Sequence, residues 1–446
     1  MGGDVRIAER LDSLPLRPFH WKLVTASGLG WMFDALDSGL VSFVLAVLVK
    51  EWALTPTQTG RIGSMGLVGM FAGAILVGSL ADRYGRKALF QATLAVFSVA
   101  TGLCALAWSY ASLLALRFLV GFGLGGELPV ASTLVSEFSP KAHRGKLVVV
   151  LESFWAFGWA FAAVVAYFFI PRFGWRWAFA LGSLPVLYVL YLRRAVPESP
   201  RFLEASGRFE EAKAVVRGVE AECGEPPADL EPGPAEPVRK ARFAALWEGG
   251  MGRRTLMLWA LWFAMVYSYY GIFIWLPSLL VASGHGLVKS FEYVLLITAA
   301  QIPGYFSAAW LVDRWGRKPT LMLYLLGCAV AAVAFGKAAS PSSIVLWGSL
   351  ISFFNLGAWG VVYTYTPESY PTALRGTGAG WAAGVGRIGG ILAPMVVGFI
   401  LERWAGRQDL VFLQFAAVIA VGLAAVAWLG EETKGRGLEQ IAAAMP

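Results

Sequence analysis

Twelve apolar stretches of about twenty residues constrain the fold of this chain more than any other feature, because a helix of that length crosses the hydrocarbon core of a membrane. Weakly alternating ten-residue strands, which would indicate a barrel, are not seen. Only 15% of the chain is charged, whereas soluble domains carry about a quarter charged residues. We therefore predict an all-α membrane protein with twelve transmembrane helices, at residues 21–49, 58–81, 88–108, 111–136, 147–170, 175–192, 255–282, 291–312, 319–339, 341–366, 377–401 and 409–429.

The basic residues predict the orientation of the chain. Most of the 37 Lys and Arg lie in the two termini and in the loops that follow even-numbered spans, such as DRYGRK (82–87) and SPKAHRGK (139–146). By the positive-inside rule, both termini are then cytoplasmic. The net charge of +8 reflects this bias and favours anionic lipid, so it does not indicate nucleic acid. The first span follows a charged N-terminus without a small-residue cleavage site, and we expect it to be retained.

The three cysteines and three histidines give no sign of catalysis or of a bound metal. Cys104 and Cys328 lie inside predicted spans and Cys223 lies in a long loop, so no disulfide framework or metal-ligand spacing is formed. The histidines are scattered, and no nucleophile–base group can be assembled from the sequence. We expect neither an enzyme nor a cofactor.

The two halves of the chain repeat each other. GSLADRYGRKALF (78–90) returns as AAWLVDRWGRKPT (308–320), and SEFSPKAHRGK (136–146) returns as PESYPTALRGT (367–377). Both motif pairs have the same offset of 231 residues, as between Asp82 and Asp313. The chain is therefore predicted to contain a duplicated six-helix unit. We divide it into an N-terminal bundle (1–192), a loop with an amphipathic helix and a Pro-rich linker (193–254), and a C-terminal bundle (255–446).

The repeated loops predict a network of ion pairs at the cytoplasmic edge. Acids stand beside bases in both copies, and ion pairs at a wet edge break and form again at low cost. The alternative is that these residues only set the topology. The predicted gate network consists of Asp82, Arg83, Arg86, Glu137, Arg144, Glu198, Asp313, Arg314, Arg317, Glu368 and Arg375.

These motifs resemble the major facilitator superfamily. The resemblance rests on the doubled D-R-x-G-R-K loops, on RFLVGFGLGG (117–126) and on PESPRFLEASGRFEEA (197–212), and it covers the whole chain. It points to the branch of sugar porters, organic-ion transporters and synaptic-vesicle-protein relatives. Within that branch, GWMFDALDSG (30–39), GLGGELPVASTLVSE (123–137) and LESFWAFGW (151–159) resemble the bacterial niacin transporters. The resemblance implies two pseudo-symmetric six-helix bundles with the substrate near the midplane between them.

Charges inside the predicted spans are the first candidates for function, because burying an unpaired charge is costly. Asp34 and Asp37 are three residues apart and share a helix face, so we expect one of them to carry a proton or to meet a substrate dipole while the other holds the local network. The alternative is that an aspartate caps a helix break or pairs with an arginine. The proton-coupling candidates are Asp34, Asp37, Glu127, Glu152 and Arg117, with Arg117 expected to pair with Glu127, Glu152 or an aspartate of the first span.

Arg387 lies in GWAAGVGRIGGILAP (380–394), where glycines on both sides leave room for a ligand. Its planar guanidinium matches a carboxylate. The resemblance to organic-ion transporters implies that an arginine in span eleven recognises anionic substrates. Snorkelling to the membrane surface is the alternative, but the residue lies about ten positions from either end of its span.

Most tryptophans of membrane proteins lie at the membrane interfaces. Aromatic residues near the middle of the spans could instead sandwich a flat ring of the substrate. Asn355, the only asparagine of the chain, either forms an interhelical hydrogen bond or contacts a ligand. Spans five and seven contain no amide side chain, which disfavours a sugar site. The predicted substrate residues are Arg387, Trp31, Asp34, Asp37, Trp155, Trp159, Tyr270, Asn355, Trp359 and Trp381.

The sequence thus predicts a secondary active transporter that imports nicotinate or nicotinamide by alternating access, coupled to protons. We expect it to work as a monomer in the lipid bilayer of the cell (inner) membrane. The alternatives are an aromatic-acid/proton symporter, an organic-cation transporter with Asp34 or Asp37 as counter-ion, and, from another class, a non-transporting receptor or binding protein.

Overall fold

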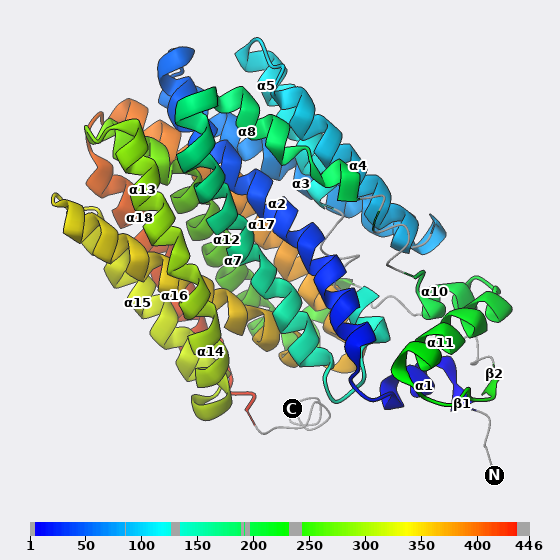
Figure 1. Cartoon of the computed structure of the whole chain (residues 1–446). Coiled ribbons are helices and arrows are strands. Elements are labelled where there is room, and N and C mark those ends of the chain that lie inside the picture. The colour runs from blue at the N-terminus through cyan, green and yellow to red at the C-terminus, as the bar shows by residue number, and fades with distance from the viewer. Residues whose placement is uncertain are drawn as a thin grey trace. The chain divides into compact units, whose positions relative to one another are not determined.

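The computed structural model describes residues 5–84, 86–125, 134–188, 191, 197–231 and 243–434, and for residues 5, 77–79, 81–84, 86, 87, 205, 372 and 373 it describes only the backbone. Nearly all of these residues are helical, which confirms the predicted all-α class. The elements are β1 (Val5–Arg6), α1 (Ile7–Ser13), α2 (Pro18–Glu51), α3 (Pro56–Tyr84), α4 (Arg86–Cys104), α5 (Tyr110–Gly125), α7 (Arg144–Phe173), α8 (Trp175–Gly182), α10 (Pro200–Ala205), α11 (Phe209–Cys223), β2 (Leu230–Glu231), the 3-10 helix η1 (Phe243–Leu246), α12 (Met251–Ala282), α13 (Leu287–Ala299), α14 (Gln301–Trp315), α15 (Arg317–Phe335), α16 (Pro341–Glu368), α17 (Thr372–Arg403) and α18 (Gln408–Leu429), as shown in Figure 1.

Within the described part of the chain, nine helical segments are long and apolar enough to cross a membrane, and α4 and α5 contribute two shorter apolar helices. The predicted span at 291–312 is divided at Ala300, where α13 ends and α14 begins. The span predicted at 111–136 begins as α5, but residues 126–133 lie outside the described residues.

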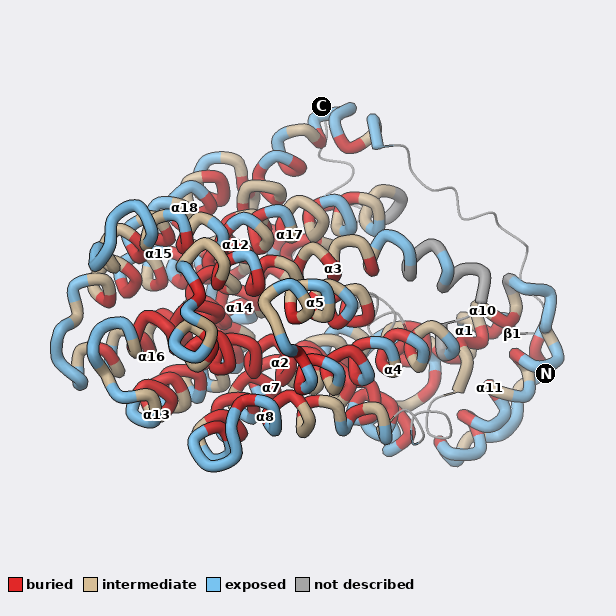
Figure 2. The backbone as a smooth tube through the Cα atoms, turned by 90° about the horizontal axis from the view of Figure 1, so that it is seen from above, coloured by how far each residue is buried: buried red, intermediate tan, exposed pale blue. Residues whose placement is uncertain are grey.

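The spans differ in how much protein surrounds them. The most apolar windows of α2 and α12 are 78% buried, whereas those of α17 and α18 are 39% buried. Figure 2 shows the buried residues running along α2 and α7. Side chains that are exposed on apolar spans face lipid in a membrane protein, so α2 and α12 are inner helices and α17 and α18 each present a face to lipid.

The sequence repeat extends to helix packing. A Cβ on Gly73 would lie 2.1 Å from the carbonyl oxygen of Phe122, and a Cβ on Gly304 would lie 2.2 Å from that of Phe353. Both distances are far too short for a real contact, so only glycine permits the approach of α3 to α5 and of α14 to α16. Gly304 and Phe353 each follow their counterparts by 231 residues, the offset of the loop motifs.

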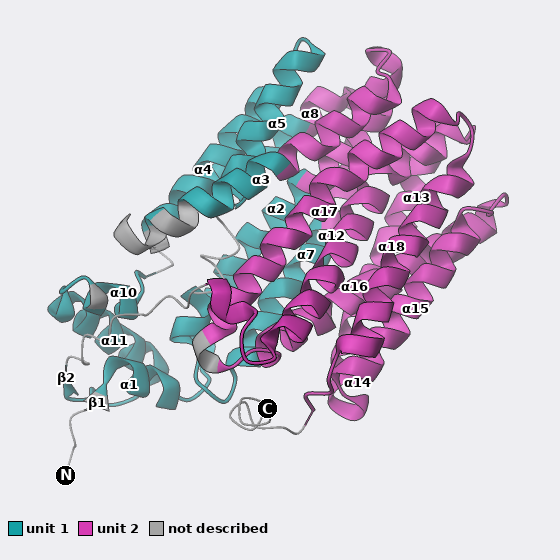
Figure 3. Ribbon diagram, turned by 180° about the vertical axis from the view of Figure 1, so that it is seen from behind, with its two compact units in different colours: residues 1–37, 68–158, 179–238 teal, residues 38–67, 159–178, 239–446 magenta. Residues whose placement is uncertain are grey.

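The structure contains two compact units, shown in Figure 3. The first comprises Met1–Asp37, Val68–Gly158 and Phe179–Val238, and the second comprises Ser38–Leu67, Trp159–Ala178 and Arg239–Pro446. The units therefore do not follow the halves of the repeat. The predicted division of the sequence at 193–254 concerns the duplication and stays a prediction.

A small folded lobe in the first unit joins the N-terminal segment to the loop that follows span six. α1 buries Ile7 and Leu11 and lies near α11, which buries Ala212 and Val216, while β1 pairs in parallel with β2. Figure 1 shows these elements gathered near the N-terminus. Glu220 binds the lobe together, because its carboxylate accepts a 2.6 Å hydrogen bond from the guanidinium of Arg10. The predicted amphipathic helix is thus present as α11, and its apolar side is covered by the N-terminal segment.

In the second unit, segments of the first half of the sequence pack on the second half. The hydroxyl of Ser64 donates to the carbonyl oxygen of Ile391 at 2.7 Å, and the hydroxyl of Thr57 donates to the carboxylate of Glu402. These contacts join the beginning of α3 to the end of α17. They lie at the ends of the spans away from the N-terminus of α2, since the chain crosses along α2 before it enters α3.

Candidate functional site

The first unit contains a buried acid–base cluster. Arg117 on α5 donates from Nη1 to Oδ1 of Asp37 at 3.2 Å and from Nη2 to Oδ2 at 2.8 Å, and Thr101 on α4 donates to Oδ1 at 2.7 Å. Asp37 is fully buried and Arg117 is 3% exposed. Two parallel charge-assisted hydrogen bonds fix both side chains. Arg117 thus pairs with an aspartate of the first span, one of the partners that the sequence left open.

The other acids of this unit lie close by in the sequence or on neighbouring helices. Asp34 is fully buried one turn before Asp37. Glu152 on α7 is also buried and lies near the indole of Trp31, and the rings of Trp31 and Trp155 are 4.6 Å apart. The described spans of this unit therefore bury three carboxylates, and Arg117 pairs with that of Asp37. Glu127, the fourth acid that the sequence singled out, lies outside the described residues.

The acid–base cluster belongs to one half of the repeat only. The residue 231 positions after Arg117 is Gly348 on α16. The side chain of Ile297 occupies the space that a side chain at this position would need. Both copies of the repeat therefore have the packing glycines Gly73 and Gly304. Only the first copy has an intramembrane arginine at the position of Arg117.

The second unit contains the other intramembrane arginine. Arg387 on α17 lies beside the hydroxyl-bearing rings of Tyr270 on α12 and Tyr363 on α16. No carboxylate lies within ion-pair distance of its guanidinium in the part of the chain that the structure describes. The glycines beside it do more than leave room for a ligand, since a Cβ on Gly386 would lie 2.8 Å from Val266 and one on Gly389 would lie 2.7 Å from the carbonyl oxygen of Phe263. They bring α17 close to α12, which places the guanidinium against a wall of aromatic rings that includes Tyr270 and Tyr363.

This wall is a network of aromatic rings in the second unit. Trp359 lies 5.4 Å from Tyr363 and 6.4 Å from Tyr269, measured between ring centroids, and Trp159 lies 5.9 Å from Tyr269. Tyr269 in turn lies 5.5 Å from Tyr270. The structure thus brings together four predicted substrate residues, Arg387, Tyr270, Trp359 and Trp159, while Trp31 and Trp155 lie in the other unit.

Trp381, a further predicted substrate residue, has different neighbours. Its ring is 47% exposed and lies 4.7 Å from that of Phe243 and 6.4 Å from that of Trp259. Phe243 belongs to the short helix that precedes α12, so Trp381 packs near the end of its span. This is the interfacial place that most tryptophans of membrane proteins occupy.

Asn355 links three helices of the second unit. Its Nδ2 donates to the hydroxyl of Ser268 on α12 at 3.0 Å and lies 3.6 Å from the sulfur of Cys328 on α15, while its Oδ1 is buried without a partner among the described residues. The predicted interhelical hydrogen bond is therefore present. Within the described residues, the Oδ1 atom of Asn355 remains able to accept a hydrogen bond from a ligand.

Gln301 is a candidate that the sequence argument missed. It is fully buried, and within the described residues neither its Oε1 nor its Nε2 has a hydrogen-bond partner. Gly348 touches Ile297 and Gly304 touches Phe353, so Gln301 lies beside the segment of α16 that includes the buried, unpartnered hydroxyl of Ser352. The signal in the sequence is a glutamine inside an apolar span.

The predicted gate residues of the second half form a network. The guanidinium of Arg317 donates from Nε and Nη2 to the carboxylate of Glu368 at 2.9 and 2.8 Å, and the hydroxyl of Thr433 donates to the same carboxylate at 2.6 Å. Arg375 donates to the carbonyl oxygen of Pro367 at 2.9 Å. Arg314 stacks over the ring of Trp310 at 4.3 Å, and the side chain of Asp313 is exposed.

The first half repeats the arginine-to-carbonyl contact, has a hydroxyl-to-glutamate contact like that of Thr433, and contains one addition. Arg144 donates to the carbonyl oxygen of Ser136 at 2.9 Å, as Arg375 does to Pro367, and the hydroxyl of Ser199, the residue after Glu198, donates to the carboxylate of Glu137. The addition is Asp12, whose carboxylate also pairs with Arg144 and lies 3.6 Å from Arg201. Burial lowers the pKa of Arg201, and Asp12 opposes that shift. Of the remaining predicted gate residues, the side chains of Asp82, Arg83 and Arg86 lie outside the described ones.

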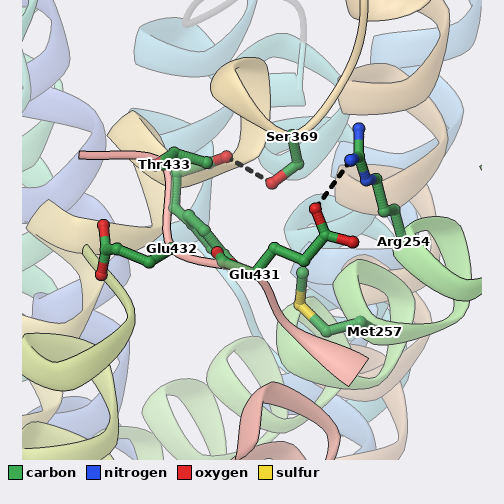
Figure 4. Close-up of a pocket in the computed structure, with 7 residues that line it drawn as sticks. Arg254, Met257, Ser369, Glu431, Glu432 and Thr433 are labelled. Carbon is green, nitrogen blue, oxygen red and sulfur yellow. Dashed lines mark hydrogen bonds and ion pairs between the residues drawn. The ribbon is translucent and has the colours of Figure 1, made fainter. Parts of the chain in front are cut away.

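A small pocket lies beside the second network. It is lined by Arg254, Met257, Tyr365, Ser369, Glu431, Glu432 and Thr433, and Figure 4 shows Arg254 and Glu431 turned toward each other, with 2.8 Å between Nη2 and Oε2. Glu432 accepts hydrogen bonds from the backbone N–H groups of Arg317 and Lys318 at 3.0 Å, which places an anion at the N-terminus of α15. This pocket thus belongs to the ion network. None of the predicted substrate residues lines it.

Comparison with known proteins agrees with this architecture. The family described as "Sugar (and other) transporter" matches residues 31–445. The niacin transporter NiaP of Acinetobacter baylyi is 51% identical over 98% of this chain and 99% of its own length, and the putative niacin/nicotinamide transporter NiaP of Bacillus subtilis is 47% identical over 94% and 98%. The inward-open structure of the xylose transporter XylE from E. coli has a TM-score of 0.76 at 19% identity, covering 96% of this chain and all of that one, and shows the fold alone.

Proposed function

The chain belongs to the sugar-transporter family of the major facilitator superfamily, and from this premise we propose that it imports nicotinate or nicotinamide by alternating access. It is a multi-pass membrane transporter and not an enzyme. The proposal for the substrate rests on the two relatives named for niacin, which align with nearly the whole chain, and on the chemistry of the second unit.

The single observation that carries the proposal is the guanidinium of Arg387. It lies deep in the membrane part of the second unit, beside Tyr270 and Tyr363, and none of the carboxylates in the described residues pairs with it. A desolvated cation without a counter-ion favours binding of an anion, and a guanidinium can donate two parallel hydrogen bonds to a carboxylate. Nicotinate supplies one carboxylate.

In this proposal the ring of the substrate binds among the aromatic residues next to Arg387. Tyr270, Tyr363 and Trp359 offer faces and edges against which a pyridine ring can stack. Nicotinamide has the same ring without the full negative charge. The open acceptor of Asn355 suits its amide N–H, so both ligands fit the chemistry of this unit, with nicotinate favoured by the charge.

Proton coupling is proposed for the acids of the first unit. Asp37 is held by Arg117 and Thr101, and two more carboxylates, Asp34 and Glu152, are buried in the spans of the same unit. Carboxylates inside membrane spans are typical members of proton relays. Asp34, Asp37 and Glu152 are therefore the proposed carriers, and Arg117 is the residue that positions Asp37.

Alternating access is supported by the duplication and by the two sets of terminal contacts. The ion networks around Glu137 and Glu368 lie in equivalent loops of the two halves, and the contacts of Thr57 and Ser64 with α17 lie at the opposite ends of the spans. A transporter of this kind must break one set while it keeps the other. The exposed or half-buried ion pairs of the loops are inexpensive to break.

The orientation completes the proposal. Both termini and the loops that follow even-numbered spans, which include the loops of these ion networks, carry most of the 37 basic residues, and by the positive-inside rule we propose that they lie in the cytoplasm. We propose that the protein acts as a monomer in the cell (inner) membrane.

Uptake into proteoliposomes tests the proposal. We expect labelled nicotinate to accumulate when a proton gradient is imposed, and unlabelled nicotinate and nicotinamide to compete with it. Binding without accumulation would instead support a receptor. Competition by benzoate-like acids stronger than that by nicotinate would favour an aromatic-acid symporter, and competition by organic cations would favour the carrier in which Asp34 or Asp37 is the counter-ion.

A further inference from the structure

A groove on the first unit lies outside everything described so far. It has a volume of about 460 Å³ and is lined by Trp21, Lys22, Thr25, Ala26, Leu29, Tyr188 and Tyr191. Five of these residues occupy the first turns of α2, and the other two follow α8 in the sequence. The groove thus lies at the end of the first span that is next to the N-terminus, at the level of the membrane surface.

One wall of this groove is fixed by the protein. The hydroxyl of Tyr188 donates to the carbonyl oxygen of Ala26 at 2.9 Å, and the ring of Phe33 lies 5.5 Å from that of Tyr188. Tyr191 stacks on Tyr188 with a centroid distance of 5.4 Å and is 49% exposed. An aromatic surface is therefore held open between α2 and the rings of Tyr188 and Tyr191.

Large apolar side chains are exposed on the segment that contributes Tyr188 to the groove. Leu184 and Leu187, which precede the tyrosines on the same segment, are 54% and 62% exposed. Large apolar side chains that are exposed on a membrane-spanning segment contact acyl chains. Trp21 on the other wall is 38% exposed, as is usual for the aromatic belt at the headgroup level.

The polar groups of the groove lie at its outer rim. Lys22 is half-exposed one turn before the exposed Thr25, whereas Ala26 and Leu29 lie deeper along α2. Along α2 a cation and a hydroxyl thus come before aliphatic side chains, while Trp21, Tyr188 and Tyr191 add aromatic rings to the walls. A glycerophospholipid presents its phosphate, ester linkages and acyl chains in this order. We propose that the groove binds one anionic glycerophospholipid of the membrane leaflet next to the N-terminus, with its phosphate on Lys22 and its acyl chains along Leu29, Leu184 and Leu187.

Lys22 already has one acidic neighbour, which sharpens the proposal. Its Nζ lies 3.6 Å from the carboxylate of Glu222 at the end of α11, and both side chains are 51% exposed. A long pair between exposed groups is weak, so a phosphate can displace Glu222. The lipid would then compete with α11 for Lys22, and removing the charge of Glu222 should strengthen lipid binding.

A lipid titration of the purified full-length protein in detergent tests the site. The measurement is the rise in unfolding temperature with added dioleoyl phosphatidylglycerol, because a ligand of the folded state stabilises it. Lys22→Gln should raise the lipid concentration for half of the effect about fivefold, which corresponds to about 1 kcal/mol for one basic residue at the membrane surface. Glu222→Gln should lower that concentration, and Lys22→Arg should restore the parent value. Lys22→Gln should change the effect of phosphatidylcholine much less, because the choline cation of that lipid offsets the charge of its phosphate.

The matched control is Lys50→Gln, which removes the same charge from the other end of α2, where Lys50 is exposed. It should leave the titration unchanged. Trp21→Ala should weaken both lipids equally, since it removes a wall and no charge. Equal effects of Lys22→Gln and Lys50→Gln, or weaker binding in Glu222→Gln, would overturn the proposal. Stabilisation by inorganic phosphate at the same concentrations would also overturn it, because the site would then recognise a free anion and not a lipid.

Discussion

Arg117 and Asp37 are joined by two hydrogen bonds, one from each terminal nitrogen to each carboxylate oxygen, in a place where both side chains are buried. Thr101 donates a third hydrogen bond to the same carboxylate. If Asp37 takes up a proton, it loses the charge that holds Arg117, and the guanidinium is left buried without its counter-ion. Breaking a buried pair from one side costs several kcal/mol, so protonation of Asp37 would be coupled to movement of α2 against α5.

Asp37→Asn should abolish uphill uptake driven by an inward proton gradient and spare the exchange of substrate across the membrane, because asparagine keeps the shape of the side chain but cannot release a proton. The measurement is uptake and counterflow of labelled nicotinate in proteoliposomes. Thr101→Val is the matched control. It removes one hydrogen bond and keeps the carboxylate, so uphill uptake should persist. Equal pH dependence in Asp37→Asn and the parent would show that the pair is structural, and loss in Asp34→Asn alone would identify Asp34 as the carrier.

Arg387→Ala should weaken nicotinate binding by one to two orders of magnitude. The charge-assisted pair that it removes is worth about 1.5 to 3 kcal/mol, and about 1.4 kcal/mol corresponds to a factor of ten. Nicotinamide, which has no full charge, should lose much less, and Arg387→Lys should restore only part of the nicotinate affinity because the ammonium lacks the planar fork. Binding of both ligands is measured by calorimetry.

The control for this series is Arg403→Ala, which removes an exposed arginine from the end of the same helix and should change neither affinity. Parallel losses of both ligands in Arg387→Ala would mean that Arg387 supports the fold. A cationic ligand that binds better once Arg387 is neutralised would favour the organic-cation alternative.

Glu368→Gln should loosen the loop network more than Asp313→Asn. Glu368 receives two hydrogen bonds from Arg317 and one from Thr433, whereas the side chain of Asp313 is exposed. The readout is the rate at which a maleimide labels Thr364→Cys, a half-buried position one turn before Glu368.

All three native cysteines are buried, which keeps the background of that labelling low. We expect faster labelling in the Glu368→Gln background and little change with Asp313→Asn. Equal rates in both backgrounds would show that the repeated acids only set the topology.

Gly304→Ala should destabilise the protein by about 1 to 3 kcal/mol, the usual cost of inserting a methyl group into a packed interface. The added Cβ would lie 2.2 Å from the carbonyl oxygen of Phe353, so α14 and α16 would have to separate. Gly73→Ala should have a similar effect, since its Cβ would meet Phe122 in the same way. Gly218→Ala on α11 has no neighbour within 4 Å of the new atom and should leave the unfolding temperature unchanged or raise it. A neutral Gly304→Ala would mean that the two helices are not in close contact.

The sequence alone determined the class of fold and the family. Apolar stretches of membrane-spanning length are a local property of the chain, and a helix satisfies its own backbone hydrogen bonds, so the spans follow from composition without knowledge of their neighbours. The offset of 231 residues likewise needs no coordinates. The same offset relates the packing pair Gly73 and Phe122 to the pair Gly304 and Phe353, but these contacts became apparent only in the structure.

Tertiary structure decided which charges meet. The helical period places Asp34 and Asp37 on one face, but it cannot tell which of them α5 brings to Arg117, because that depends on how two helices are rotated against each other. It also decided that Trp381 packs on Phe243 and Trp259, that Asp12 joins the loop arginines, and that Gln301 is buried without a partner among the described residues. Each of these depends on segments far apart in the sequence, whose meeting is fixed only when the side chains of all the helices are packed together.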